Sequence, residues 1–277
     1  MEQTKLQELK RIAANVRLGA LECVYSAASG HPGGALSIAD ILTYLYFEHM
    51  HIDPKNPTWS ERDRFVLSKG HTCPALYAVL AEKGYFPKED LKTFRQIDSY
   101  LQGHPDMKHT PGVDMTTGSL GLGISAACGM ALSGKIDRKT YRVYSILGDG
   151  EVEEGQVWEA AMFAAHYQLD NLCAFVDVNG LQIDGPTEKV MNSAPLCDKF
   201  RAFGWHTIDI DGHDFEQIAA ALQEAGQTVG QPTMILAKCV KGKGVSFMEN
   251  QVGWHGKAPK QEEYEQAVAE IKTAAGL

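Results

Sequence analysis

The spacing of apolar residues predicts a chain in which helices alternate with strands. Over residues 4–29, leucine, isoleucine and valine recur every three or four positions, as on the buried face of a long helix. The expected strands are 64–67, 144–147, 172–178, 206–210 and 233–239, and the other expected helices are 37–47, 73–83, 124–133, 215–225 and a polar helix at about 260–277. This alternation predicts an α/β fold: a doubly wound, mainly parallel sheet with helices on both faces.

Breaker residues separate these elements. The glycines and the proline of residues 29–34 are expected to end the first helix, and residues 53–63 are expected to form a loop. Residues 84–117 are rich in Pro and Gly and have little periodicity. Loops of that length are usually disordered or functional. Because this one contains His104 and His109, we expect a functional loop.

Residues 145–185 predict one βαβ unit around which the rest of the chain is organised. An apolar strand runs into Gly148, Asp149 and Gly150, a helix rich in Glu and Ala follows, and a second apolar strand ends before Asn179. The crossover of such a unit is almost always right-handed, so both strands are parallel and end at the edge of the sheet where α/β proteins bind ligands. We therefore expect Asp149 and Asn179 to lie close together.

The residue types at that edge suit a metal ion and a phosphate group. The two glycines allow the backbone to approach a bulky anion, and the next helix points its positive N-terminus at the same place. Mg²⁺ takes one or two protein oxygens and shares its other positions with phosphate and water. Gly-Asp-Gly alone is more typical of an ordinary turn. The second strand, its Asn179 and the following Leu-Gln-Ile-Asp-Gly segment favour the binding site.

Four of the ten histidines stand beside Gly or Pro in predicted turns: His31, His71, His104 and His255. A histidine held in a tight turn is a good candidate for ligand contact. The histidines without that setting are interpreted as structural: His49, His51, His166, His206 and His213. For His109, which adjoins Thr-Pro-Gly, both interpretations stay open.

Composition and charge narrow the class of protein. The 277 residues suffice for one large α/β domain, and the net charge of −9 disfavours nucleic acid and anionic membranes as partners. The six cysteines are scattered without a Cys-x-x-Cys pair, so neither a disulfide framework nor a zinc site is expected. The N-terminus does not look like a signal peptide, and no apolar run approaches the roughly 18 residues of a membrane span, so we expect a cytoplasmic protein.

The Gly-Asp-Gly segment, the later Asn and their flanks resemble the thiamine diphosphate and metal motif of transketolases. Other blocks follow in family order, so the resemblance covers most of the chain: Ser-Gly-His31-Pro-Gly, Ser-x-Gly-His71, Gly-His104-Pro, Thr-Thr-Gly118-x-Leu-Gly and Trp-His255-Gly. The sequence departs from the family pattern at Ser119, Leu122 and Val178, none of which is an expected ligand.

The resemblance implies the thiamine diphosphate-binding fold, with the cofactor held through Mg²⁺, or through Ca²⁺ or Mn²⁺. It implies Asp149, Asn179 and the carbonyl of Leu181 as metal ligands. The further cofactor contacts that it implies are His71, Gly118, Leu120, Gly150, Ile183 and His255. His31 and His104 would hold the hydroxyls and the carbonyl of a sugar. Glu154 and Glu159 would communicate with a partner domain, although acidic residues in a first turn also suit the helix dipole.

By the same resemblance, the chain would be the N-terminal subunit of a split transketolase of the pentose phosphate pathway type. Such an enzyme transfers a two-carbon ketol unit from a ketose phosphate to an aldose phosphate. Residues 1–277 would form a single diphosphate-binding domain. The pyrimidine-binding and C-terminal domains, with the glutamate that activates the cofactor, would lie on a separate chain in an α₂β₂ complex.

Other interpretations stay open. A 1-deoxyxylulose-5-phosphate synthase shares Ser-Gly-His and Gly-Asp-Gly, but the blocks at Asp106, Asp114 and His255 look more like transketolase. The α chain of a 2-oxo-acid dehydrogenase should lack the blocks at His31 and His255. A non-catalytic, cofactor-binding subunit would have no need of His31 and His104. Pentose phosphate, sulfo-sugar and branched-sugar substrates are not distinguished by the sequence.

Overall fold

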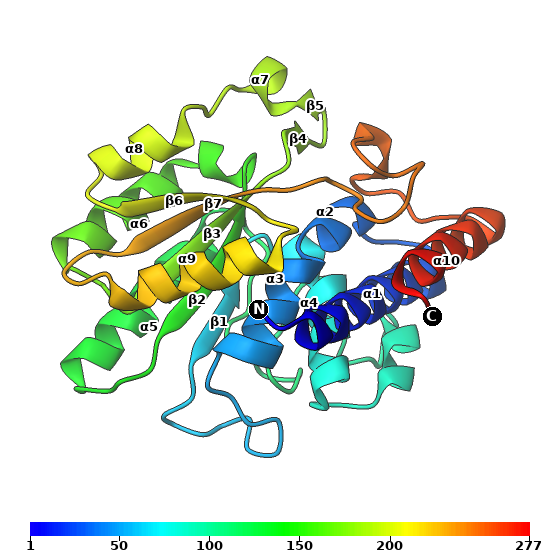
Figure 1. Cartoon of the computed structure of the whole chain (residues 1–277), viewed down its shortest axis with the longest axis horizontal. Coiled ribbons are helices and arrows are strands. Elements are labelled where there is room, and N and C mark those ends of the chain that lie inside the picture. The colour runs from blue at the N-terminus through cyan, green and yellow to red at the C-terminus, as the bar shows by residue number, and fades with distance from the viewer.

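The computed structural model describes residues 1–277 and is built around a five-stranded, all-parallel sheet (Figure 1). The strands are β1 (Arg64–Leu67), β2 (Val143–Gly148), β3 (Leu172–Val178), β6 (His206–Asp211) and β7 (Thr233–Lys238), and they lie in the order β1-β2-β3-β7-β6. Two short antiparallel strands, β4 (Leu181–Gln182) and β5 (Gly185–Pro186), form a small hairpin above the end of β3. The predicted parallel sheet is confirmed.

The helices cover both faces of this sheet, as predicted. They are α1 (Gln3–Ser26), α2 (Pro32–Ser37), α3 (Ala39–Tyr44), α4 (Cys73–Lys83), α5 (Leu122–Ile136), α6 (Gly155–His166), α7 (Thr187–Val190), α8 (Leu196–Ala202), α9 (Phe215–Gln227) and α10 (Gln261–Ala275). Figure 1 shows α5, α6 and α8 gathered at the left of the view, whereas α1 and α10 run side by side at the right.

Alternate side chains of β1, β2, β3 and β7 enter two separate cores, whereas the edge strand β6 contributes to one of them only. In β2, Tyr144 and Ile146 pack into a large cluster with α1, α3, α4 and α9. Their neighbours Val143 and Leu147 belong to a second cluster, which α5, α6 and α8 complete. Burial on both faces explains why the strands are almost continuously apolar. A charged residue in such a strand is therefore exceptional, and β3 contains one, Asp177.

The glycine- and proline-rich segment 29–34 follows the end of α1, as predicted, but its last residues are themselves helical, because α2 begins at Pro32. Pro32 occupies the first position of α2, where its missing N–H costs no hydrogen bond. The expected helix 37–47 is divided into α2, α3 and a π-helical turn, Leu45–His49. Position 33 of this helix is a glycine because a β-carbon there would lie 2.9 Å from the carbonyl oxygen of Trp254. The glycines of this segment thus permit close packing.

Several short elements were not predicted. They include a 3₁₀ turn in the long segment 84–117, Lys88–Thr93, and the β4–β5 hairpin with α7 and α8 after it. The predicted C-terminal helix is confirmed as α10, which packs on α1 and forms a small third cluster around Trp254 and Ile271. None of the helices combines the length and the apolar composition that a bilayer crossing requires.

Candidate cofactor cleft at the sheet edge

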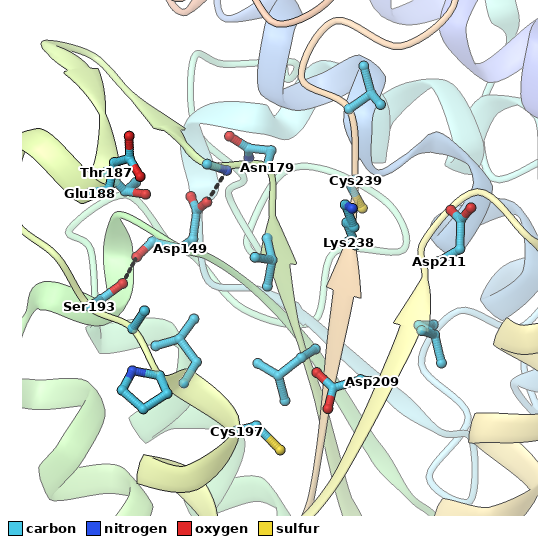
Figure 2. Close-up of a pocket in the computed structure, with 18 of the residues that line it drawn as sticks. Asp149, Asn179, Thr187, Glu188, Ser193, Cys197, Asp209, Asp211, Lys238 and Cys239 are labelled. Atoms are coloured by element: carbon cyan, nitrogen blue, oxygen red, sulfur yellow. Dashed lines mark hydrogen bonds between the residues drawn. The ribbon is translucent and has the colours of Figure 1, made fainter.

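The carboxyl ends of β2 and β3 lie level with each other. Their register pairs Gly148 with Asp177, so the residues that follow each strand emerge at the same edge. Figure 2 shows Asp149 and Asn179 side by side there, with the carboxylate directed at the segment that begins with Asn179. Asp149 Oδ2 accepts the N–H of Gly180 at 2.5 Å. The predicted proximity of the two strand ends is confirmed.

A cleft of about 250 Å³ opens above these strand ends. Eight of the predicted residues line it: His71, Leu120, Asp149, Gly150, Asn179, Leu181, Ile183 and His255. The other predicted residues lie beside the cleft or outside it. His31 contacts the cleft histidines, Gly118 packs against His104, and Glu154 is exposed at the N-terminus of α6. The sequence therefore identified most of the cleft lining.

Three oxygens converge on the side of the cleft formed by the β4–β5 hairpin. They belong to the Asp149 carboxylate, the Asn179 side chain and the Leu181 carbonyl, and each accepts a hydrogen bond from the protein, from Gly180 N, Leu181 N and Lys241 Nζ respectively. No group of three or more His, Cys, Asp or Glu side chains gathers as a metal cluster in the chain. A cation here would depend on one carboxylate, on an amide and a carbonyl oxygen, and on the phosphate of its ligand, which is the coordination that suits Mg²⁺.

The charge on Asp149 fits a bound cation. Burial, and next the negative charge of Asp177, raises the pKa of Asp149 to about 6. A divalent ion at this position would offset both effects, because it would pair the buried carboxylate with positive charge. The residues present therefore fit a metal–diphosphate group.

A buried ion pair lies beneath the cleft. Lys69 Nζ is 2.5 Å from Asp177 Oδ2, and the same oxygen accepts hydrogen bonds from Ser37 Oγ and Asn179 Nδ2. The Lys69 side chain also donates to the carbonyl of Gly34. Asp177 thus fixes the amide orientation of Asn179. Sequence reasoning missed this pair, although a charged residue at the end of an apolar strand was the available signal.

Lys241 is a second lysine that the sequence analysis did not single out. Its Nζ donates to the Leu181 carbonyl at 2.8 Å and lies 2.9 Å from His255 Nδ1. Burial, and then the neighbouring Lys69, lowers the pKa of Lys241 to about 8. An anion in the cleft would favour the charged ammonium. The Lys-Gly-Lys-Gly loop was the sequence signal for this residue.

Three predicted histidines form one cluster. The ring centroids of His31 and His71 are 5.0 Å apart, those of His31 and His255 are 5.5 Å apart, and those of His71 and His255 are 5.4 Å apart. Burial is the main cause that lowers the pKa of His31 to about 4 and of His255 to about 3, and it lowers the pKa of His71 as well. All three imidazoles are therefore neutral near pH 7. They can donate and accept hydrogen bonds.

His104 approaches the same region from the long loop. A β-carbon on Gly118 would lie 3.2 Å from its ring, which explains the glycine at that position. The Tyr77 hydroxyl donates to the His104 carbonyl at 3.0 Å and so fixes the backbone. Burial lowers the pKa of His104, with Arg95 as the second cause.

Two glutamates near the Gly-Asp-Gly turn have opposite surroundings. Glu151, which sequence analysis did not select, is buried and accepts hydrogen bonds from Gly121 N, Gly148 N and Ser68 Oγ. It joins the turn after β2 to the start of α5. Glu154 is exposed and makes no capping hydrogen bond to α6.

Several other histidines have protein partners away from the cleft, as expected of structural residues. His49 bonds to the Tyr144 hydroxyl, His206 to Glu224, and His213 to both Asp40 and the N–H of Val240. His109, for which the sequence allowed both interpretations, is largely exposed and bonds to Asp106.

A larger groove of about 1030 Å³ adjoins the cleft above the ends of β3, β7 and β6 (Figure 2). Asp149 and Asn179 line both cavities. Figure 2 shows Asp209 and Asp211 on the β6 side of the groove, Lys238 at the end of β7, and Thr187, Glu188 and Ser193 on the opposite wall. The groove carries charges of both signs.

Known proteins match the chain over nearly its whole length. The family model described as "Transketolase, thiamine diphosphate binding domain" matches residues 8–277. A relative named "6-deoxy-6-sulfo-D-fructose transketolase subunit SqwG", from Clostridium sp. (strain MSTE9), is 51% identical over 96% of each chain. A relative from Phocaeicola vulgatus, which is named as one subunit of an apulose-4-phosphate transketolase, is 43% identical over 91% of this chain and 89% of its own.

Other relatives are longer. Transketolase of Mus musculus is 46% identical over 98% of this chain, which spans 43% of the mouse protein. The crystal structure of transketolase from Campylobacter jejuni superposes with a TM-score of 0.91 at 35% identity, over 100% of this chain and 43% of that one. The chain thus corresponds to less than half of these proteins but to nearly all of the separately encoded subunits. It belongs to the transketolase family, as the family's thiamine diphosphate binding domain.

Proposed function

We propose that this chain is the N-terminal, diphosphate-binding subunit of a split transketolase. With a separate chain that carries the pyrimidine-binding and C-terminal domains, it transfers a two-carbon ketol unit from a ketose phosphate to an aldose phosphate. The observation that carries the proposal is the single cleft in which the Gly-Asp-Gly turn, the Asn179 strand end and the histidine cluster meet. Residues 1–277 act as one diphosphate-binding domain.

In this proposal, Asp149, Asn179 and the Leu181 carbonyl hold Mg²⁺, and Gly150, His71 and His255 contact the diphosphate. Gly118, Leu120 and Ile183 line the remainder of the cofactor site. Lys241, although not predicted, joins the diphosphate contacts, because its ammonium lies buried in the same cleft and, with a pKa of about 8, is still mainly charged at pH 7. Thiamine diphosphate, when bound, supplies the nucleophilic carbon and the electron sink for carbon–carbon bond cleavage.

His31 and His104 are the proposed sugar contacts. Both imidazoles border the cleft, and neither carries a charge near neutral pH, because burial lowers their pKa values. A neutral imidazole can donate a hydrogen bond to one sugar oxygen or accept a proton from another. The Nδ1 atom of His31 is buried without a protein partner, so the protein alone leaves the hydrogen-bonding capacity of this ring unused.

A partner surface is the second part of the proposal. Large apolar side chains protrude from α5, α6 and the residue after α6: Leu122, Ile136, Met162, Phe163 and Tyr167. Concentrated exposure of this kind marks protein–protein contact. Glu154 and Glu159 lie exposed on the same helix α6 and would face the partner chain. An α₂β₂ assembly would cover this surface.

The names of the relatives indicate which donor substrates to test. The relative named for 6-deoxy-6-sulfo-D-fructose is 51% identical and matches this chain over 96% of both lengths, against 43% for the relative named for apulose-4-phosphate. A 6-sulfonated ketose is therefore the second candidate donor beside a ketose phosphate. The catalytic chemistry of the two is the same, because the anionic group lies far from the carbonyl.

The experiment reconstitutes the enzyme from this chain and the product of a neighbouring reading frame that encodes the missing domains. Ketol transfer from a ketose phosphate and from 6-deoxy-6-sulfo-D-fructose is measured with each chain alone and with both. Activity that requires both chains, thiamine diphosphate and Mg²⁺ supports the proposal. Ketol transfer by this chain alone, or pyruvate as the only accepted donor, would contradict it.

A further inference from the structure

Arg95 lies between the two segments that carry His31 and His104, and its backbone is unusual. Its φ is 62°, in the left-handed region that residues other than glycine seldom adopt. The Arg95 N–H donates to the Leu101 carbonyl at 2.8 Å, which holds this conformation in place. Backbone strain of this kind is concentrated at functional sites.

On one side, Arg95 contacts the segment before His31. Its Nη1 donates to the Ser29 hydroxyl, two residues before His31. The neighbouring Phe94 is fully buried against Gly30, since a β-carbon on Gly30 would lie 3.3 Å from the Phe94 ring. Residues 94 and 95 thus support both residues that precede His31.

On the other side, the guanidinium lies against the residue before His104. A β-carbon on Gly103 would lie 2.8 Å from Arg95 Nε, 3.2 Å from Nη2 and 3.3 Å from Cζ. Only glycine leaves room for the guanidinium plane at this distance. Arg95 Nε is buried and has no hydrogen-bond partner, so packing rather than hydrogen bonding fixes this end of the side chain.

The charge of Arg95 also reaches both imidazoles. After burial, it is the next cause that lowers the pKa of His31 and of His104. The other titratable groups around His31 are His71, His255, Lys241 and His104 itself. No carboxylate among them opposes the guanidinium.

We propose that Arg95 is a positioning residue that sets the separation between His31 and His104, with one contact on each segment. This inference rests on the proposed function, in which both histidines hold the sugar. A planar, branched guanidinium can donate to Ser29 and pack on Gly103 at once, whereas the single ammonium of lysine can reach only one of them.

Three variants test the proposal in the reconstituted enzyme. Arg95→Asn keeps the backbone conformation, since Asn tolerates the left-handed region, but removes the guanidinium. Arg95→Lys keeps the charge, and Gly103→Ala keeps Arg95 but displaces its side chain. Each is expected to lower kcat/KM for the ketose by on the order of 100-fold, as misplacement of contact groups does, while thiamine diphosphate affinity is unchanged. Arg138→Asn is the matched control, because Arg138 is exposed and also has a positive φ of 55°.

A second measurement needs neither a partner nor activity. In the isolated, ¹⁵N-histidine-labelled chain, Arg95→Asn should raise the pKa of both His31 and His104, and Gly103→Ala should move both sets of ring signals. His49, which faces Asp63 and Arg142, is the internal reference. Unchanged His31 and His104 signals, or equal losses of cofactor affinity and of kcat/KM, would overturn the proposal. Shifted signals in an enzyme that transfers no ketol group would support the Arg95 contact and reject the proposed function instead.

Discussion

Lys69 and Asp177 form an ion pair in which the side chains are 3% and 0% exposed and Nζ lies 2.5 Å from Oδ2. The pair joins the residue before Gly70-His71 to the end of β3, and through Asn179 it reaches the cation ligands. Two segments more than a hundred residues apart in sequence therefore depend on each other for charge balance.

Lys69→Met should destabilise the protein by about 3–5 kcal/mol, because it leaves the Asp177 carboxylate buried without its counter-ion. The free energy of unfolding is measured in urea at pH 7. Lys139→Met is the control, since the Lys139–Glu61 pair is exposed and contributes little. Equal changes in the free energy of unfolding for the two substitutions would show that the buried pair stabilises the fold no more than the exposed pair does.

Asp149→Asn should have opposite effects on stability and on binding. In the free protein the pKa of Asp149 is raised from 3.8 to about 6, so the folded state binds the proton more tightly than the unfolded state does. Stability is therefore lost as pH rises from 3.8 through 6, and the neutral Asn should add on the order of 2 kcal/mol at pH 7. Thiamine diphosphate binding in Mg²⁺ should be weakened. Calorimetry with and without Mg²⁺ measures the affinity for thiamine diphosphate. Equal affinities of the parent and the variant would show that Asp149 is not a ligand of the cation.

The histidine cluster should make the free protein sensitive to acid. The folded pKa of His31 is lowered from 6.5 to about 4, so the unfolded state binds more protons in this window. The stability due to neutral His31 is complete above about pH 6.5 and is lost as pH falls toward 4. His31→Gln should reduce the loss between pH 7 and 5 by on the order of 1 kcal/mol, a value that allows for solvent screening of a partly exposed ring. Parallel pH profiles of unfolding for the parent and the variant would contradict the burial argument.

His104→Asn should lower kcat/KM for the ketose in the reconstituted enzyme, by on the order of 100-fold, because a proton-transferring contact is lost. Thiamine diphosphate affinity should not change. His109→Asn is the control in the same loop, since His109 is 68% exposed and bonds only to Asp106. Equal turnover of the two variants would exclude His104 from the sugar site.

Phe163→Glu should prevent assembly with the partner chain, because it places a charge among the exposed apolar side chains of α6. Gel filtration of the mixed chains measures the effect, and circular dichroism shows whether the variant is folded. Val229→Glu is the control, as Val229 is 83% exposed but lies in the loop before β7. Normal assembly of the Phe163 variant would show that the partner chain binds another surface.

Much of this arrangement could be predicted because it depends on local sequence. Right-handed crossovers bring consecutive parallel strands to one edge, so Asp149 and Asn179 could be paired without coordinates. The histidines in turns were recognisable by the Gly and Pro beside them. The boundaries of β1, β2, β3 and β7 followed from apolar runs that are buried on both faces.

The rest depends on contacts between distant segments. Lys69 meets Asp177, and Lys241 meets Leu181, only because of how loops from different parts of the chain pack over the sheet. Lys69 has no local pattern that distinguishes it from a surface residue, and the Lys-Gly-Lys-Gly loop around Lys241 marks a turn without showing that the lysine is buried. The helix at Pro32 was missed for a related reason, since Gly33 is explained by the close approach of Trp254 and Gly34 by that of Thr72.

The rings of His31 and His255 are 5.5 Å apart, although nearly the whole chain separates them in sequence. A ribosome must therefore synthesise the chain through His255 before these two rings can meet in the binding site. Because a ligand stabilises only the form that binds it, the vitamin-derived cofactor should protect finished molecules from proteolysis and give no protection to shortened translation products.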